Sequence, residues 1–131
     1  MPSVFTKIIN GEIPSYKIAE DENFYAFLDI NPLKKGHTLV VPKIEEDYVF
    51  NLNDQTLQEL MLFSKRVAKA MKEAIPCLRI GVSIIGLEVP HAHVHLIPID
   101  HINDMSFNRP KLVLDSEIMK KIQESIAVNF N

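Results

Sequence analysis

Three of the five histidines in this chain of 131 residues stand at alternate positions of one short stretch, as His91, His93 and His95 in HAHVHLIPI. Successive side chains of a β-strand point to opposite faces, so alternate residues share a face. The three imidazoles are therefore expected in a row on one face, while the small and aliphatic residues that alternate with them face the core. Core packing does not require three imidazoles, so the row indicates a chemical role.

A metal site is one chemistry that such a row allows. Two histidines at i and i+2 of a strand can bind one zinc ion at nitrogen–zinc distances of about 2.0–2.1 Å. At ~3.3 Å per residue, however, the α-carbons of His91 and His95 are about 13 Å apart, so all three cannot comfortably share one ion. A metal would use two of them and need further ligands. A row of solvated surface histidines is the simpler alternative, although the apolar residues on both sides of the stretch favour an interior position.

Catalysis at a phosphoryl group is the third possibility. Neutral imidazole, with a reference pKa of about 6.5, is unprotonated at one nitrogen and nucleophilic at neutral pH. Flanking imidazoles can donate hydrogen bonds to phosphate oxygens and protonate a leaving group. His93 is the natural nucleophile, because both neighbouring histidines can then reach the same phosphate.

The elements that position these side chains follow from the periodicity of the sequence. A short helix is expected from Ser3 to Gly11, and a long one from an N-cap at Asn53 to Pro76, with apolar residues at 57, 60, 61, 67, 71 and 74. A third helix closes the chain over about 112–128, with a stripe of Ile118, Ile122 and Ile126. Strands are expected over 15–20, 23–30, 37–43, 79–86 and 91–99. Together they predict an α+β fold with a mainly antiparallel five-stranded sheet.

Composition limits the class of protein. The length predicts one domain over residues 1–131, and no apolar run approaches the ~20 residues of a membrane span. The formal net charge of −3 argues against a nucleic-acid partner, which requires a basic face. No signal-peptide pattern opens the chain, so a cytoplasmic location is expected. Cys77 is the only cysteine, which excludes an intrachain disulfide and a cysteine-based metal cluster.

The stretch HAHVHLIP also matches the pattern of the histidine-triad (HIT) family. The segment FTKIINGEIPSYKIAEDENFYAFLDINPLKKGHTLVVPK resembles the N-terminal half of that family, and GLEVPH resembles the stretch before its triad. The resemblance covers residues 4–99, and the C-terminal helix is similar to extensions of some bacterial members. It implies a purine nucleotide as substrate, no cofactor and a homodimer that joins the two sheets through the long helix and a neighbouring strand.

The resemblance also implies roles for particular residues. His93 would attack the α-phosphorus, His91 and His95 would hold phosphate oxygens, and His95 would also protonate the leaving group. His37 resembles a fourth histidine near the phosphate, and Asp29 stands where the family binds ribose, for which a carboxylate is a suitable acceptor. The base pocket would be formed by apolar residues: Phe5, Ile8, Phe27, Ile30 and Leu39.

The chain departs from the family pattern at several positions. Many members hold a structural zinc ion with two cysteines and a histidine, where this chain has Ser3, Thr6 and Glu45, so no metal is expected. Leu87 replaces a glutamine. Two further candidates for phosphate contacts are Glu88, which follows it, and Ser83, which could substitute for an asparagine.

The sequence thus predicts a hydrolase that cleaves at a nucleoside α-phosphate through a nucleotidyl-histidine intermediate. A nucleoside phosphoramidase is the first expectation and a dinucleoside polyphosphate hydrolase the close alternative. A nucleotide-binding regulatory protein with little turnover is the alternative from another class.

Overall fold

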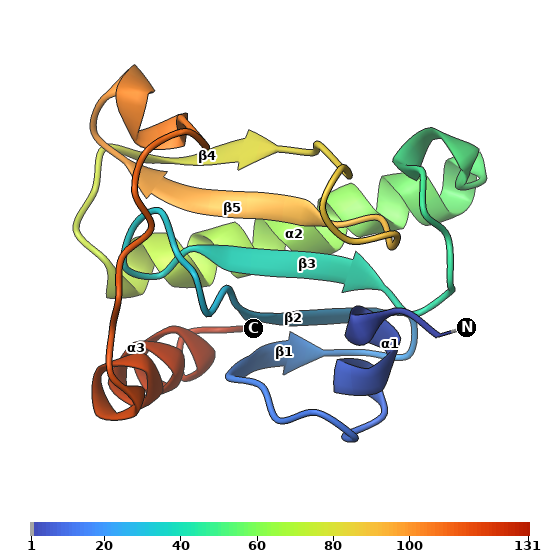
Figure 1. Ribbon diagram of the computed structural model, residues 1–131, viewed down its shortest axis with the longest axis horizontal. Coiled ribbons are helices and arrows are strands. Elements are labelled where there is room, and N and C mark those ends of the chain that lie inside the picture. Colours follow the sequence, from blue (N-terminus) through green and yellow to red (C-terminus); the bar gives the residue numbers. More distant parts are fainter. Residues whose placement is uncertain (1) are drawn as a thin grey trace.

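The strands form one antiparallel sheet. The computed structural model describes residues 2–131, and within that range five strands pair in the order β1-β2-β3-β5-β4 (Figure 1). Each neighbouring pair is antiparallel. The strands are β1 (Lys17–Glu20), β2 (Phe24–Leu28), β3 (Thr38–Pro42), β4 (Arg79–Ser83) and β5 (Val94–Ile99). The predicted α+β class with a five-stranded antiparallel sheet is confirmed.

Three α-helices accompany the sheet in the described part of the chain: α1 (Val4–Ile9), α2 (Asp54–Ala74) and α3 (Ser116–Ala127). Each begins at a side chain that accepts a hydrogen bond from a backbone N–H of its first turn, namely Ser3, Asn53 and Asp115. Two short 3₁₀ helices, η1 (Val49–Asn51) and η2 (Ile102–Met105), follow β3 and β5. Among residues 2–131, no helix is both long and apolar enough to cross a bilayer.

The two faces of the sheet have different coverings. Alternation along β2 sends Phe24 and Ala26 to the face that α2 covers, in the main core. Tyr25 and Phe27 point to the other face, where they pack with Phe5 of α1. Figure 1 shows α2 running behind the sheet and α1 in front of its β1 and β2 side. The site described below lies on the α1 face.

The buried stripes of the helices differ in part from the predicted ones. Met61 is 41% exposed, and Phe63, which the stripe omitted, is buried in α2. In α3 the buried residues are Met119 and Ile126, whereas Ile118 is 37% exposed. The reason is that α3 packs against β1 and α2, so the stripe that faces them starts at Met119 and not one residue earlier. Of the predicted segment 112–128, residues 116–127 are helical.

The histidine-bearing strand is shorter than the predicted 91–99. It begins at Val94, which is the partner of Val40 in β3. Before it, the backbone N–H of Ala92 donates to the carbonyl of Glu46 in the loop after β3, at 2.6 Å. Two residues further along β3, Pro42 has no N–H to extend the ladder. Regular pairing therefore ends at Val94, and His91 does not stand in a straight row with the other two histidines.

Candidate active site

A cleft on the α1 face holds most of the residues that the sequence singled out. Its volume is about 290 Å³, and it lies between α1, β2, β3 and the histidine strand. Nine of the predicted site residues line it: Phe5, Ile8, Phe27, Asp29, Ile30, Leu39, Glu88, His93 and His95. Further lining residues that the sequence analysis did not name include Val4, Ile13, Pro14, Ser15 and Val89. The walls are mainly apolar, and the polar candidates among the lining residues are Asp29, Glu88, His93 and His95.

His93 presents an unprotonated nitrogen in this cleft. Its Nδ1 lies 2.7 Å from the carbonyl oxygen of His91, and a carbonyl can only accept, so Nδ1 carries the proton. The other nitrogen, Nε2, then keeps its lone pair. The ring packs edge-on against Phe5 and His95, with centroids 5.0 and 4.9 Å away. Burial lowers the pKa of His93, so the ring is neutral and nucleophilic at neutral pH.

His95 has the opposite tautomer, which a chain of hydrogen bonds determines. The backbone N–H of Leu33 donates to His37 Nδ1 at 3.0 Å, so the proton of His37 is on Nε2. That Nε2 lies 3.0 Å from His95 Nδ1 and donates to it, which leaves the proton of His95 on Nε2. Burial lowers the pKa of His37 to about 3 and that of His95 to about 4, so both rings are neutral. His95 therefore offers an N–H beside the lone pair of His93.

His91 and His37 lie outside the lining of the cleft. His91 is fully buried, and both of its nitrogens have partners within the protein: Nε2 the carbonyl of Pro42 and Nδ1 the hydroxyl of Ser3, each at 2.7 Å. The predicted direct contacts of His91 and His37 with phosphate therefore do not fit this arrangement. Each contacts a histidine of the cleft instead, His91 through its carbonyl and His37 through its ring.

The three remaining polar candidates lie at different distances from the histidines. Asp29 is half-buried and lines the cleft, with its Oδ2 3.7 Å from His37 Nε2, and its Oδ1 accepts from the backbone N–H of Asn31 at 2.8 Å. Burial raises the pKa of Asp29, with the Glu88 charge adding to the effect. Glu88 lines the cleft but is exposed. Ser83 is the partner of His95 in the β4–β5 ladder and does not line the cleft.

Two clusters of potential metal ligands can be tested against these hydrogen bonds. In the first, Asp29, His37 and His95 each offer an atom within 4.8 Å of the others. The nitrogens of His37 and His95 that face each other share a proton, however, so a cation there would have to break that contact and the bond from Leu33.

The second cluster stands where the resemblance implies zinc in other members. Ser3, Thr6, Glu45 and His91 are joined directly: Thr6 Oγ1 donates to Glu45 at 2.5 Å, and Ser3 Oγ contacts His91 Nδ1 at 2.7 Å. Thiolates and imidazoles are the ligands that structural zinc prefers, and this cluster contains one imidazole and no thiolate. The residues present do not fit zinc.

The purified protein is accordingly expected to contain far less than one zinc ion per chain. Elemental analysis after extensive dialysis measures the content. A variant with Ser3→Cys, Thr6→Cys and Glu45→His is the matched control, because it supplies two thiolates and a second imidazole beside His91. One tightly held zinc ion per wild-type chain would contradict the prediction.

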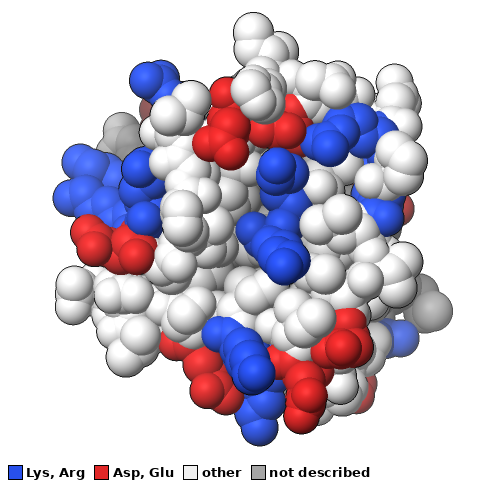
Figure 2. Space-filling view, turned by 90° about the vertical axis from the view of Figure 1, so that its left-hand side faces the viewer, with Lys and Arg blue, Asp and Glu red and all other residues white. Residues whose placement is uncertain are grey.

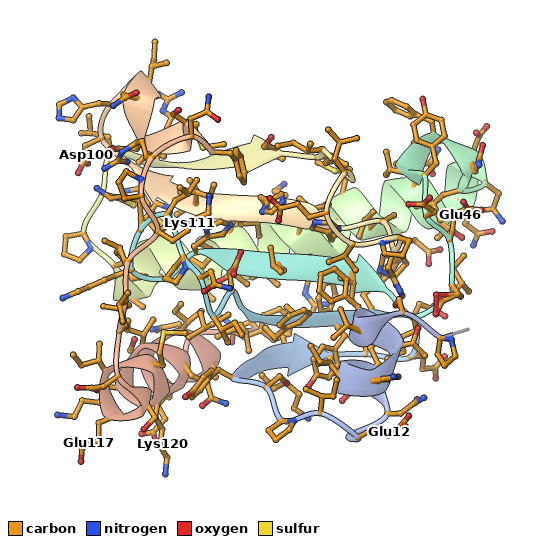
Figure 3. The ribbon with its side chains drawn as sticks, in the orientation of Figure 1. Glu12, Glu46, Asp100, Lys111, Glu117 and Lys120 are labelled. Carbon is orange, nitrogen blue, oxygen red and sulfur yellow. The ribbon has the colours of Figure 1, made fainter. Side chains whose placement is uncertain are left out.

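The segment between η2 and α3 adds two residues that the sequence analysis missed. The Phe107 ring packs against His95 with centroids 4.8 Å apart. The Lys111 Nζ donates to the carbonyl of Phe107 at 3.0 Å and lies 5.5 Å from the centre of its ring. Figure 3 shows Lys111 directed from this segment toward the sheet. A cation thus lies near His95, beside the Phe107 ring that packs against it.

The sheet and the cleft define the class of protein, an α+β protein with a histidine-based site on one face of an antiparallel sheet. The family model described as HIT domain matches residues 10–102, which is more than half of the chain. The chain belongs to the HIT family.

Individual relatives cover most of the chain. An uncharacterized HIT-like protein of Borreliella burgdorferi is 38% identical over an alignment 134 positions long, which covers 96% of this chain and 96% of that protein. The adenosine 5'-monophosphoramidase of Saccharomyces cerevisiae is 44% identical over 96 residues, 72% of this chain and 61% of the yeast protein. The crystal structure of a HIT-like protein involved in cell-cycle regulation from Bartonella henselae aligns with a TM-score of 0.84 at 29% identity, covering 98% of this chain and 96% of that one.

Proposed function

We propose that this protein is a hydrolase that cleaves at the α-phosphate of a purine nucleotide through a nucleotidyl-His93 intermediate, with nucleoside phosphoramidates as its first substrate class. One observation carries the proposal. His93 holds its proton on Nδ1 against the His91 carbonyl, so that the lone pair of Nε2 is free in a cleft of about 290 Å³. Support also comes from the yeast relative, which is named for adenosine 5'-monophosphoramidase activity.

The reaction proceeds in two displacements. His93 Nε2 attacks the α-phosphorus, a nitrogen–phosphorus bond forms, and the bond to the leaving amine breaks with its electron pair on the amine. The amine takes one proton from His95 Nε2. The negative charge left on that ring is stabilised by the N–H that His37 donates to its other nitrogen, and it is balanced by the positive charge of the nucleotidyl-His93 ring. Water then attacks the same phosphorus, the bond to His93 breaks, and a proton of that water returns to His95. The histidines end as they began.

The nucleoside would occupy the apolar part of the cleft. Phe5, Phe27 and Leu39 are nearly buried in the wall and offer ring and aliphatic surface to a purine. Asp29, which also lines the cleft, is a suitable acceptor for the two ribose hydroxyls. The α-phosphate would then lie against His93 and His95.

The proposal is tested by a single-turnover reaction with labelled adenosine 5'-phosphoramidate. Because a phosphoramidate bond is labile in acid, the quench is alkaline, and intact mass followed by peptide mapping locates the label. Transient label on His93 is expected. Tight nucleotide binding without label or turnover on any substrate of a panel would contradict the proposed hydrolase activity. It would support the alternative of a nucleotide-binding regulatory protein.

A dinucleoside polyphosphate is the second candidate substrate, and Lys111 is the observation that favours it. Its ammonium stands beside Phe107 and His95, where the leaving group would lie. An amine leaving group gains nothing from a cation there, whereas a departing phosphate does. Figure 2, which faces this end of the molecule, shows lysine and arginine side chains in the middle of the face, with acidic groups above and below them.

Replacing Lys111 with methionine is expected to discriminate between the two substrate classes. The change removes the charge and keeps an unbranched side chain. We expect kcat/KM for diadenosine polyphosphates to fall about tenfold, equivalent to about 1.4 kcal/mol, and that for the phosphoramidate to stay within about twofold. Lys120→Met on the exposed side of α3 is the control and should change neither. Equal losses on both substrates would contradict the assignment of Lys111 to the leaving group.

A homodimer through β4 and α2 is also expected. β4 is an edge strand, and apolar side chains on it and on α2 are exposed, such as Val82 at 50% and Leu62 at 61%. Burial of such a surface favours association. Light scattering at micromolar concentration should give twice the mass of 14.9 kDa. Val82→Lys, which places a charge on the strand edge, should shift the protein toward the monomer. A wild-type monomer would rule the dimer out.

A further inference from the structure

The start of α1 is joined to His91 by a hydrogen-bonded group that the proposed reaction does not use. The Ser3 hydroxyl lies 2.7 Å from His91 Nδ1 and accepts from the Thr6 N–H at 3.1 Å. Glu45, from the loop after β3, accepts from the Ser3 N–H at 2.9 Å and from the Thr6 hydroxyl. Ser3 is 6% exposed and His91 0%, so water does not compete for these contacts.

The direction of each hydrogen bond in this group follows from its partners. His91 Nε2 faces the carbonyl of Pro42 and must donate to it, so a neutral ring has a lone pair on Nδ1. The Ser3 hydroxyl donates to that lone pair at 2.7 Å, because the other oxygen that could accept its proton, the Thr6 hydroxyl, is farther from it at 3.4 Å. The Glu45 carboxylate lies 3.8 Å from the same nitrogen.

The backbone of His91 transmits this arrangement to the nucleophile. Its carbonyl accepts from His93 Nδ1 at 2.7 Å, and that contact determines the tautomer in which His93 Nε2 is free. A ring fixed at both nitrogens, to Ser3 on one side and Pro42 on the other, holds this carbonyl in place. Phe5, two residues after Ser3, packs edge-on against both the His91 and His93 rings.

The N-cap residues of α2 and α3 do not contact a buried side chain in the way that Ser3 contacts His91. Asn53 and Asp115 each accept from one backbone N–H at the start of their helix, and both are exposed. Ser3 performs the same capping of α1 and in addition contacts a buried histidine. Capping alone does not account for a hydroxyl at this position.

We propose that Ser3 is a positioning residue for the nucleophile: its hydroxyl keeps His91 neutral beside the Glu45 carboxylate, and His91 in turn orients His93. The inference rests on the proposed function for its kinetic consequence only. Its structural content, which nitrogen of each ring carries a proton, is independent of any substrate. In this chain the hydrogen bonds among Ser3, Thr6, Glu45 and His91 hold the start of α1 against the segment before β5. These residues do not fit a zinc ion.

Removal of the hydroxyl has a defined consequence. Without it the buried His91 Nδ1 has no donor, and the nearest polar partner is Glu45, 3.8 Å away, which can only accept. His91 would then take up a proton and pair with Glu45. A His91 ring that moves toward Glu45 would shift the His91 carbonyl, which orients His93. Its positive charge would also make the free nitrogen of His93 less basic.

Ser3→Gly is the variant that tests this, because glycine is tolerated at an N-cap at a cost of only a few tenths of a kcal/mol. Asn53→Gly at the start of α2 is the matched control for capping. Ser3→Thr restores a hydroxyl, and Ser3→Gly combined with Glu45→Gln removes the carboxylate that the protonated ring would need. All four are compared with the wild type as the full chain.

Nitrogen-15 NMR of histidine-labelled protein at pH 7 gives the readout that requires no activity. The wild type is expected to show His91 protonated on Nε2 alone and His93 on Nδ1 alone. Ser3→Gly should show His91 protonated on both nitrogens, and the added Glu45→Gln should abolish that second proton. Unchanged His91 resonances in Ser3→Gly would overturn the inference.

Kinetics give the second readout. Ser3→Gly should lower the single-turnover rate with adenosine 5'-phosphoramidate by about ten- to a hundredfold, while nucleotide affinity stays within about threefold. Ser3→Thr should recover the rate to within about threefold, and Asn53→Gly should leave it unchanged. Equal losses in Ser3→Gly and Asn53→Gly, or no recovery in Ser3→Thr, would overturn the inference and leave a purely structural cap. A wild type without turnover would contradict the proposed function, and the NMR experiment would still test Ser3.

Discussion

His93→Ala is expected to lower the rate of the chemical step by about four orders of magnitude or more, the scale on which enzymes lose activity when a covalent nucleophile is removed. The physical reason is that alanine cannot form the bond to phosphorus. His95, the neighbouring ring, cannot replace it, because its Nδ1 accepts from His37 and its Nε2 carries a proton. A water molecule in the cleft of the variant would also have no base at the position of His93 to activate it.

Nucleotide binding should survive the same substitution. The apolar walls, Asp29 and His95 remain in the cleft, so we expect the dissociation constant of AMP to change by less than about tenfold, or ~1.4 kcal/mol. Single-turnover kinetics and calorimetric titration measure the two effects separately. Phe107→Leu serves as the control for altered packing around the histidines and should lose far less activity. Turnover of His93→Ala near the wild-type rate, or label on another residue, would end the proposal.

His95→Ala is expected to have an effect that depends on the leaving group. General acid catalysis contributes about 10²- to 10⁴-fold when the departing atom needs a proton. An amine needs one, so the loss on adenosine 5'-phosphoramidate should fall in that range. A leaving group that is stable as an anion, such as p-nitrophenolate, needs none, and the loss should then be below about tenfold.

The comparison of the two leaving groups separates this role from alternatives. Removal of the His95 ring also leaves His37 Nε2 without its acceptor, so a general disturbance of the site would slow both substrates equally. His95→Gln, which keeps a polar group of intermediate length, should show the same dependence on leaving group as alanine. Loss of activity with a chelator, together with equal losses in His37→Ala and His95→Ala on every substrate, would indicate a metal site instead.

The sequence predicts the elements of this protein well, because they depend on local patterns. The long apolar period after Asn53 and the stop at Pro76 define α2 to within two residues of its observed ends. The apolar patterns of the strands and the turn residues between them are sufficient to predict the antiparallel sheet. The alternation of His93 and His95 with apolar residues also places both rings on the face opposite the main core, where the cleft lies.

The resemblance to the HIT family supplied what periodicity does not. Phe5, Ile8, Phe27, Ile30 and Leu39 each read as ordinary core residues in their own elements. They come from three different elements and one loop, and the structure brings all five to the walls of one cleft. A local pattern can show that a residue is apolar and which face it shares, but not whether that face meets a core or a cavity.

The state of each histidine was decided by the tertiary structure alone. Which nitrogen carries the proton depends on partners far along the chain: His37 lies 58 residues from His95, and Ser3 lies 88 residues from His91. The three imidazoles therefore differ: His93 has a free nitrogen in the cleft, His95 offers an N–H there, and His91 is buried with a partner at each nitrogen. Lys111 likewise reaches His95 only because the loop after η2 folds back over the sheet. Sequence spacing determines that the three histidines are near one another, whereas hydrogen-bond partners from β3, α1 and distant loops determine what each of them can do, since a ring nitrogen is a donor or an acceptor only in relation to the atom that faces it.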